Sequence, residues 1–164
     1  MTPEQEAQFS AHGCVCRCLL WLANHRQTRV MTKAQFIDTF SLDFPNEWDP
    51  VVRQTCGVTN TSMMLEIARK LNLPRNLQVY RSPGRVRDHF NKKETTTVLM
   101  VTEKREPAWD DFIHCRLVVP PAMIPYAGVE WSVVDVDDTI SLCNMRTIKD
   151  ADLDQWGAYF CVFA

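Results

Sequence analysis

A cysteine that follows a glycine and precedes an apolar stretch is the residue of this 164-residue chain best suited to nucleophilic chemistry. Cys14 comes directly after Gly13, and the residues from 15 to 23 are apolar on nearly every side. Such a run predicts a helix buried in the middle of a domain, with Cys14 at its first turn. The N–H groups and partial positive charge of a helix N-terminus favour the thiolate form of a cysteine. We therefore expect Cys14 to be a reactive thiol, with its pKa lowered from ~8.5 into the range ~3.5–7.5.

Two further cysteines, Cys16 and Cys18, lie inside the same predicted helix. We expect both to be buried, because cysteine outside disulfides behaves as a small hydrophobe. The chain has seven cysteines, and the four outside residues 14–18 stand singly, without the second closely spaced pair of a zinc site. No metal or cofactor is therefore expected. The odd number of cysteines, without disulfide-type spacing, favours a reducing compartment.

A thiol nucleophile needs an imidazole, usually distant in sequence, and a group that orients the imidazole. His114 is the best candidate because it lies near the start of a predicted strand, residues 112–119, which would hold it rigidly. The next predicted strand, residues 129–136, carries Asp135. Pairing of these strands about the middle of their connecting loop would place Asp135 roughly opposite His114. Asp137 stays an alternative, because a two-residue slip would exchange the two aspartates.

The other three histidines fit this role less well. His12 lies in the same tight entry segment as Cys14, where its geometry toward the thiol is uncertain. His25 falls roughly 15 Å along the predicted helix from its start, too far to reach the thiol. His89 is expected to be a solvated surface residue on a short polar helix.

The rest of the chain places helices first and strands second. A capping box from Thr32 to Gln35 predicts a second helix, and apolar residues at helical spacing predict a third from Thr61 or Ser62 until Pro74 stops it. We expect strands over residues 77–80, 95–102, 112–119, 129–136 and 158–163, and short helices over residues 85–91 and 148–156. This order indicates an α+β fold with an antiparallel sheet, in a single domain covering residues 1–164.

Composition excludes several classes of protein. A net charge of -2 with scattered lysines and arginines provides no basic stripe, so nucleic acid is not an expected partner. No apolar run approaches the ~20 residues that span a bilayer, so membrane insertion is not expected. The N-terminal residues lack the basic and apolar regions of a secretory signal. We expect a cytoplasmic location, or delivery as an effector.

The order Gln8, Cys14, His114 and Asp135 resembles that of papain-like cysteine peptidases, specifically the compact C39-like group. That family places a glutamine six residues before the nucleophilic cysteine and a histidine and an aspartate or asparagine on adjacent late strands. The resemblance implies a papain-like α+β fold, with the central buried helix packed against an antiparallel sheet. It also implies that Gln8 and the backbone N–H of Cys14 form an oxyanion hole. A Cys14, His114 and Asp135 triad would then cleave an amide bond of a peptide or protein through an acyl-enzyme.

Two features depart from the family pattern and leave alternatives open. Cys14 is followed by Val15 and Cys16 rather than by Gly-Pro, so Cys16 stays an alternative nucleophile. Asp135 is followed by Val136 and a further aspartate rather than by proline, so Asp137 stays an alternative third member. Two other functions are compatible with the same residues. One is a catalytically inactive papain-like binding module, and the other is an acyltransferase or deamidase that uses the same thiol.

Overall fold

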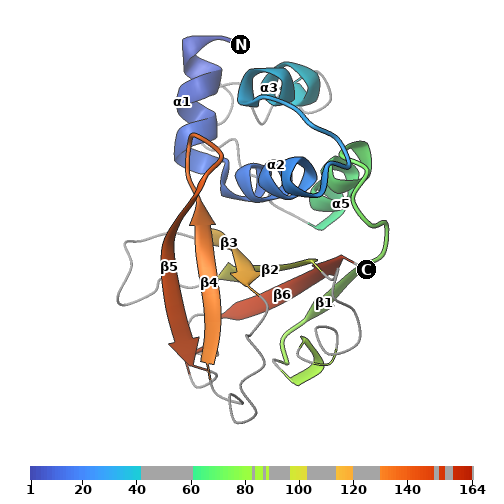
Figure 1. The fold of residues 1–164 in the computed structure, drawn as a ribbon, viewed down its shortest axis with the longest axis vertical. Coiled ribbons are helices and arrows are strands. Elements are labelled where there is room, and N and C mark those ends of the chain that lie inside the picture. Colours follow the sequence, from blue (N-terminus) through green and yellow to red (C-terminus); the bar gives the residue numbers. More distant parts are fainter. Residues whose placement is uncertain are drawn as a thin grey trace. The chain divides into compact units, whose positions relative to one another are not determined.

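The fold is that of a computed structural model of the chain (Figure 1). The structure describes residues 1–41, 61–82, 84–86, 88, 97–102, 114–119, 130–149, 152–153 and 157–163. The chain falls into two compact units, each described by itself below. The helical unit comprises residues 1–75 and 136–141, and the sheet unit comprises residues 76–135 and 142–164. The expectation of a single domain, and of a helix packed on the sheet, stays a prediction.

Helices make up most of the described helical unit. They are α1 (Pro3–His12), α2 (Cys14–Arg26), α3 (Lys33–Ser41) and α5 (Thr61–Lys70). The helices expected around residues 14–23, after Thr32 and from residue 61 are therefore confirmed. The capping box at the start of α3 is also present, because the Thr32 hydroxyl accepts from the Gln35 backbone N–H and the Gln35 side chain accepts from the Thr32 N–H.

Helix α1 is an addition to the expected elements. Thr2 caps it by accepting a hydrogen bond from the backbone N–H of Gln5, and the Gln5 side chain accepts from the Thr2 backbone N–H. Pro3 stands at the first turn, where its missing N–H costs no helical hydrogen bond. This capping box was readable in the sequence and predicts the helix that carries Gln8.

Gly13 is the single residue between α1 and α2, and its small size is required by a close approach of backbone. Its N–H donates to the carbonyl oxygen of Phe9 at 2.9 Å. A Cβ added at Gly13 would lie 2.4 Å from that same oxygen, which is inside van der Waals contact. The sharp turn into α2 therefore depends on glycine for space and not for an unusual φ, which is -88°.

Helix α2 is buried on nearly all sides, as its composition predicts. Its buried residues include Cys16 and Cys18, which are 1% and 0% exposed. The helix ends at Arg26 and is followed by Gln27 in the left-handed conformation, with φ 55°. Within the helical unit, aromatic rings pack α1 against α3, with the Phe9 and Phe36 ring centroids 5.9 Å apart.

The segment of residues 136–141 belongs to the helical unit through polar contacts with three of its residues. Asp138 accepts a hydrogen bond from the Ser10 hydroxyl at 2.5 Å, and the Lys33 ammonium lies 3.3 Å from the same carboxylate. Lys33 also pairs with Glu6 at 3.0 Å. The backbone carbonyl of Val136 accepts a hydrogen bond from Arg17 at 2.8 Å.

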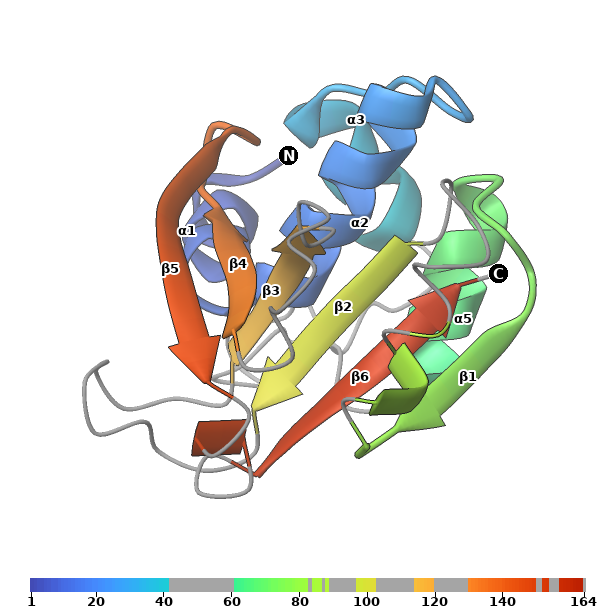
Figure 2. The ribbon, with the colours of Figure 1, turned by 60° about the horizontal axis from the view of Figure 1, so that its bottom comes forward.

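The sheet unit holds six strands in the spatial order β1, β6, β2, β3, β4, β5 (Figure 2). They are β1 (Leu77–Tyr80), β2 (Thr97–Thr102), β3 (His114–Val119), β4 (Glu130–Val136), β5 (Leu142–Lys149) and β6 (Ala158–Phe163). β1 with β6, β6 with β2, β2 with β3 and β3 with β4 all pair antiparallel. The expected α+β class with an antiparallel sheet is therefore confirmed, and five of its strands match predicted ones.

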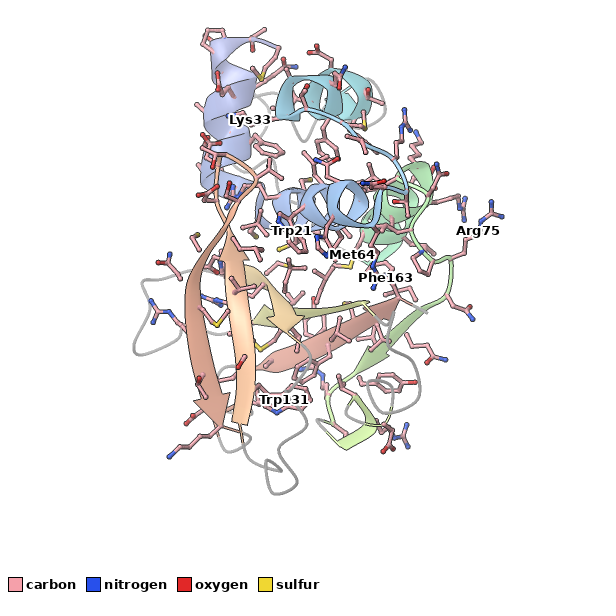
Figure 3. All side chains as sticks on the ribbon, viewed as in Figure 1. Trp21, Lys33, Met64, Arg75, Trp131 and Phe163 are labelled. Atoms are coloured by element: carbon pink, nitrogen blue, oxygen red, sulfur yellow. The ribbon has the colours of Figure 1, made fainter. Side chains whose placement is uncertain are left out.

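A core of apolar side chains covers one face of the sheet around Trp131, which Figure 3 labels. The Trp131 ring lies 5.2 Å, centroid to centroid, from that of Phe160 on β6. The same face of β3 and β4 carries Val118 opposite Val133. Because strand residues alternate between faces, Arg116 and Asp135 follow on this face, just beyond the core.

One expected element begins later in the chain than predicted. The short helix predicted over residues 148–156 begins inside a strand, because Ile148 and Lys149 are the last residues of β5. Within the expected range the described helical residues are 152 and 153. β5 is an edge strand whose side chains are mostly exposed, so it lacks the apolar alternation by which strands are recognised. For the helix expected over residues 85–91, residues 84–86 and 88 are helical, and His89 lies outside the described residues.

No helix in the described part of the chain combines the length and the apolar character needed to cross a bilayer.

Candidate active site

Cys14 is the first residue of α2 and is half-buried, whereas the other two cysteines of this helix are buried. The N-cap residue Gly13 makes no side-chain cap. Burial of Cys16 argues against the alternative nucleophile, because a substrate needs access to the thiol. No disulfide joins the cysteines that the structure describes.

Gln8 lies on the last turns of α1, six residues before the thiol. Its side-chain Oε1 is buried and accepts no hydrogen bond from the residues that the structure describes. A buried amide oxygen without a donor is uncommon in folded proteins.

Arg17 is a residue of this region that sequence reasoning missed. It is only 8% exposed, and its guanidinium donates to the carbonyls of Phe9 at 2.7 Å, Ser10 at 2.9 Å and Val136 at 2.8 Å. The first two carbonyls lie in the last turn of α1, and that of Phe9 also accepts from the Gly13 N–H. Arg17 therefore fixes the end of α1, next to Gln8, onto α2. A lone arginine in an apolar helix was the available signal.

His114 and Asp135 meet in the sheet unit, as expected. His114 Nε2 lies 2.8 Å from Asp135 Oδ1, and the two side chains are 27% and 18% exposed. An ionised carboxylate only accepts hydrogen bonds, so Nε2 carries the proton and the imidazole tautomer is fixed. His114 is the first residue of β3 and Asp135 the penultimate residue of β4, so strands hold both side chains.

The strand register that brings them together differs from the expected one by two residues. Leu117 pairs with Val134, and the same register continued by one pair sets Asp135 opposite Arg116 rather than opposite His114. A two-residue shift keeps every side chain on its face, so Asp135 becomes a diagonal neighbour of His114. The long imidazole spans this diagonal, which is why the predicted hydrogen bond survives the wrong register.

Arg116 adds a positive charge beside the carboxylate. It is 5% exposed, and its Nε lies 3.1 Å from Asp135 Oδ1, an ion-pair distance without hydrogen-bond alignment. Burial is the largest single influence and raises the pKa of Asp135. The hydrogen bond and charge of His114, then the charge of Arg116 and then the Asn144 side chain lower the pKa, and together they outweigh burial. The net pKa of Asp135 lies below its ordinary value. Asp135 is therefore an anion at neutral pH.

Asp137, the alternative third member, is occupied by its own turn. Its Oδ1 accepts from the Thr139 backbone N–H at 2.8 Å, the Thr139 hydroxyl at 2.7 Å and the Ser141 N–H at 3.0 Å. The hydrogen bond from the Thr139 side chain is the largest cause of the lowered pKa of Asp137. This carboxylate is part of a turn in the helical unit, and the observed partner of His114 is Asp135.

Two other histidines have described surroundings. His25 stacks on Trp21, with ring centroids 4.6 Å apart, and His12 is the last residue of α1. No group of three or more His, Cys, Asp or Glu side chains suited to a metal ion occurs among the described residues.

The structure thus brings together His114 and Asp135 in the sheet unit, and places Cys14 and Gln8 in the helical unit. Comparison with known protein families, with characterised proteins and with solved structures gives no match.

Proposed function

We propose that this chain is a papain-like cysteine hydrolase that cleaves an amide bond in a peptide or protein. Cys14 would be the nucleophile, His114 the general base and acid, and Asp135 the group that orients the imidazole. The observation that carries the proposal is the 2.8 Å hydrogen bond between His114 and Asp135, held on paired strands. It is supported by a half-buried thiol at the first turn of a buried helix.

The tautomer of His114 assigns the proton transfers. Because Nε2 is bound to Asp135, Nδ1 is the nitrogen that would take the proton from the Cys14 thiol. The thiolate then attacks the carbonyl carbon, the C–N bond breaks, and His114 returns the proton to the leaving amine. Water, deprotonated by the same nitrogen, attacks the acyl-enzyme and releases the acid and the thiol.

Gln8 would stabilise the oxyanion of the tetrahedral intermediate together with the backbone N–H of Cys14. Such a donor typically contributes about 2.7–4 kcal/mol of barrier stabilisation. The support for this role is the anchoring of α1, the helix that carries Gln8, by Arg17.

Selective alkylation tests the nucleophile. Sub-stoichiometric iodoacetamide at about pH 6, followed by mass mapping, should label Cys14 first, and His114→Ala should slow this labelling by removing the opposite charge. Cys143 is the matched control because it is also half-buried but lies on a strand. Cys161 should not react, since burial raises its pKa to about 12. Labelling of Cys16, or equal labelling of Cys14 and Cys143, would reject the assignment.

Product analysis then distinguishes the reactions open to the same thiol. Incubation with a peptide mixture in ¹⁸O-labelled water should place ¹⁸O in new carboxyl termini, and Cys14→Ser should abolish it. Products that carry an added amine would indicate acyl transfer instead of peptide hydrolysis. Side-chain amides converted to acids would indicate deamidation. A reactive Cys14 without any product would favour the binding module.

A further inference from the structure

Arg17 is a buried arginine in the middle of an apolar helix. It lies on α2, one turn after Cys14, and is only 8% exposed. Arginine is rarely this buried unless its donors are paired, because removing the charge from water is costly. Its planar guanidinium donates in several directions at once, so a single side chain can hold several backbone carbonyls in a fixed arrangement.

Among the described residues, the carbonyls that accept from this guanidinium come from two separate segments. Nη1 donates to the carbonyls of Phe9 and Ser10, at 2.7 Å and 2.9 Å, in the last turn of α1. Nε donates to the carbonyl of Val136, at 2.8 Å, at the end of β4. Phe9 directly follows Gln8, and Val136 directly follows Asp135. One side chain on the helix of the proposed nucleophile therefore holds the backbone beside two other residues of the proposed site.

We propose that Arg17 is a positioning residue, which ties the backbone next to Gln8 and the backbone next to Asp135 to the helix that begins with Cys14. This inference rests on the proposed function, since it assigns Arg17 to the alignment of the oxyanion donor, the orienting carboxylate and the nucleophile. Hydrogen bonds from a charged donor are stronger than those between neutral groups, so the carbonyl of Val136 is held firmly and fixes the end of β4. Arg17 acts through the backbone of these segments and not on the reacting atoms.

A simpler explanation is that Arg17 only stabilises the helical unit. Arg17→Lys separates the two explanations, because lysine keeps the buried charge but replaces the planar fork by a single nitrogen. If Arg17 aligns the site, both the surroundings of His114 and the reactivity of Cys14 change in the folded variant. If Arg17 only adds stability, the urea midpoint falls, whereas both properties keep the values of the unmodified protein below the unfolding transition.

The first measurement is the imidazole tautomer of His114, from the ¹⁵N chemical shifts of its two ring nitrogens in the full chain. His114 belongs to the sheet unit, and its Nε2 is bound to Asp135. In Arg17→Lys the end of β4 loses its fixed donor, so we expect a smaller share of the Nε2–H tautomer and ring ¹⁵N shifts that move toward each other. Ring shifts equal to those of the unmodified protein would overturn the inference.

The second measurement is the rate at which iodoacetamide labels Cys14 at about pH 6. We expect Arg17→Lys to slow this labelling by about tenfold, the effect of one hydrogen bond to a charged group. Arg29→Lys is the matched control, because Arg29 also donates to a carbonyl at a helix end, that of Lys70 on α5, at 2.7 Å. The control should leave the labelling rate and the His114 ring shifts unchanged. Equal slowing in the two lysine variants would overturn the inference.

Ile37→Val is the control for stability. Ile37 is fully buried on α3, so removal of one methylene group lowers the urea midpoint without removing a hydrogen bond. If Ile37→Val slows the labelling of Cys14 as much as Arg17→Lys does, relative to the fall in the urea midpoint, the role of Arg17 is one of stability and the inference is overturned.

A further measurement does not depend on the folding of any variant. In the unmodified protein, the Nε proton of Arg17 should exchange with water about tenfold or more slowly than that of the exposed Arg29, because it is buried and bound to Val136. Exchange at the rate of Arg29 would contradict the anchoring of β4 by Arg17.

The two readouts distinguish failure of this inference from failure of the proposed function. If Cys14 is not selectively labelled in the unmodified protein, the hydrolase is rejected. The ring shifts of His114 then still decide whether Arg17 fixes the end of β4 that carries Asp135.

Discussion

Asp135 and Asp137 are two residues apart in the sequence, yet their carboxylates have different partners. Asp135 contacts His114 and Arg116 on a neighbouring strand, whereas Asp137 accepts hydrogen bonds from the Thr139 N–H and hydroxyl and from the Ser141 N–H. The first arrangement binds an imidazole, and the second closes a turn. The sequence alone could not separate the two carboxylates, since a shift of two residues in the strand register exchanges them.

Substitution of each aspartate tests this division. Asp135→Ala should slow turnover by about 10²-fold or more, because the imidazole loses the acceptor that orients its ring and fixes its tautomer. Asp137→Ala should leave turnover unchanged and lower the urea midpoint, through loss of turn hydrogen bonds. Turnover that survives in Asp135→Ala and is lost in Asp137→Ala would exchange the two roles.

At the residue scale, the sequence predicted the His114 and Asp135 contact but not the groups around it. Alternation along a strand fixed the face of Asp135, and a face is insensitive to a register error of two residues. Arg17 and Arg116 were missed, because their roles depend on which carbonyl or carboxylate the fold brings near them. Those partners are distant in sequence or lie across a strand pair.

At the scale of elements, the junction of α1 and α2 leaves no space for a side chain at Gly13. Gly13→Ala would place a methyl group 2.4 Å from the Phe9 carbonyl oxygen, so the two helices must shift. We expect a loss of about 1–3 kcal/mol in the free energy of unfolding, measured by urea denaturation. The shift would also displace Gln8 relative to Cys14, so alkylation and turnover should fall.

Gly84→Ala is the control for this prediction. Gly84 is exposed, and a Cβ there would lie 3.9 Å from the nearest atom, the hydroxyl oxygen of Ser82. A change within about 0.5 kcal/mol is expected. A Gly13→Ala protein as stable as Gly84→Ala would show that the helix junction can relax.

Elements with a strong local signal were predictable, and the exceptions have physical reasons. An apolar run predicts α2, and a capping box predicts α3. α1 has the same kind of cap at Thr2, but few apolar residues follow it, so helical periodicity does not reveal this helix. β5 carries mostly exposed side chains, so its pairing with β4 and not its own composition makes it a strand.

At the scale of the whole molecule, three carboxyl groups between residues 135 and 138 make the fold sensitive to acid. The pKa of Asp138 is lowered chiefly by the Ser10 hydrogen bond and further by Lys33, and the pKa values of Asp135 and Asp137 are lowered as well. A group with a folded-state pKa below its unfolded value, 3.8, stabilises the fold above that value. This stabilisation is lost as the pH falls through the folded-state pKa.

Urea denaturation between pH 6 and pH 2 measures this loss. The urea concentration at the unfolding midpoint should decline once the pH is lowered below about 4. Asp138→Asn should make this decline shallower, because one of the titrating groups is gone. The variant should also be less stable than the unmodified protein at pH 6, where Asp138 is ionised and bound to Ser10 and Lys33. A decline as steep as that of the unmodified protein would assign the acid sensitivity to the other two carboxyl groups.

The fold class was predictable, whereas the strand order and the division into units were not. Antiparallel pairing follows from strands that succeed helices along the chain. The last strand, β6, however, lies between β1 and β2, and no local pattern specifies a partner eighty residues away. Residues 136–141 likewise join the helical unit through contacts with side chains more than a hundred residues earlier.

This last feature determines how the protein can be dissected. A fragment that ends at residue 75 would contain every described helix of the helical unit, yet it would lack the carbonyl of Val136 and the carboxylate of Asp138. Arg17 and Lys33 would each lose a partner, and the buried guanidinium would be left partly without acceptors. A synthetic peptide that supplies residues 136–141 should therefore bind such a fragment and restore its stability, so that this segment acts as a ligand of the helices.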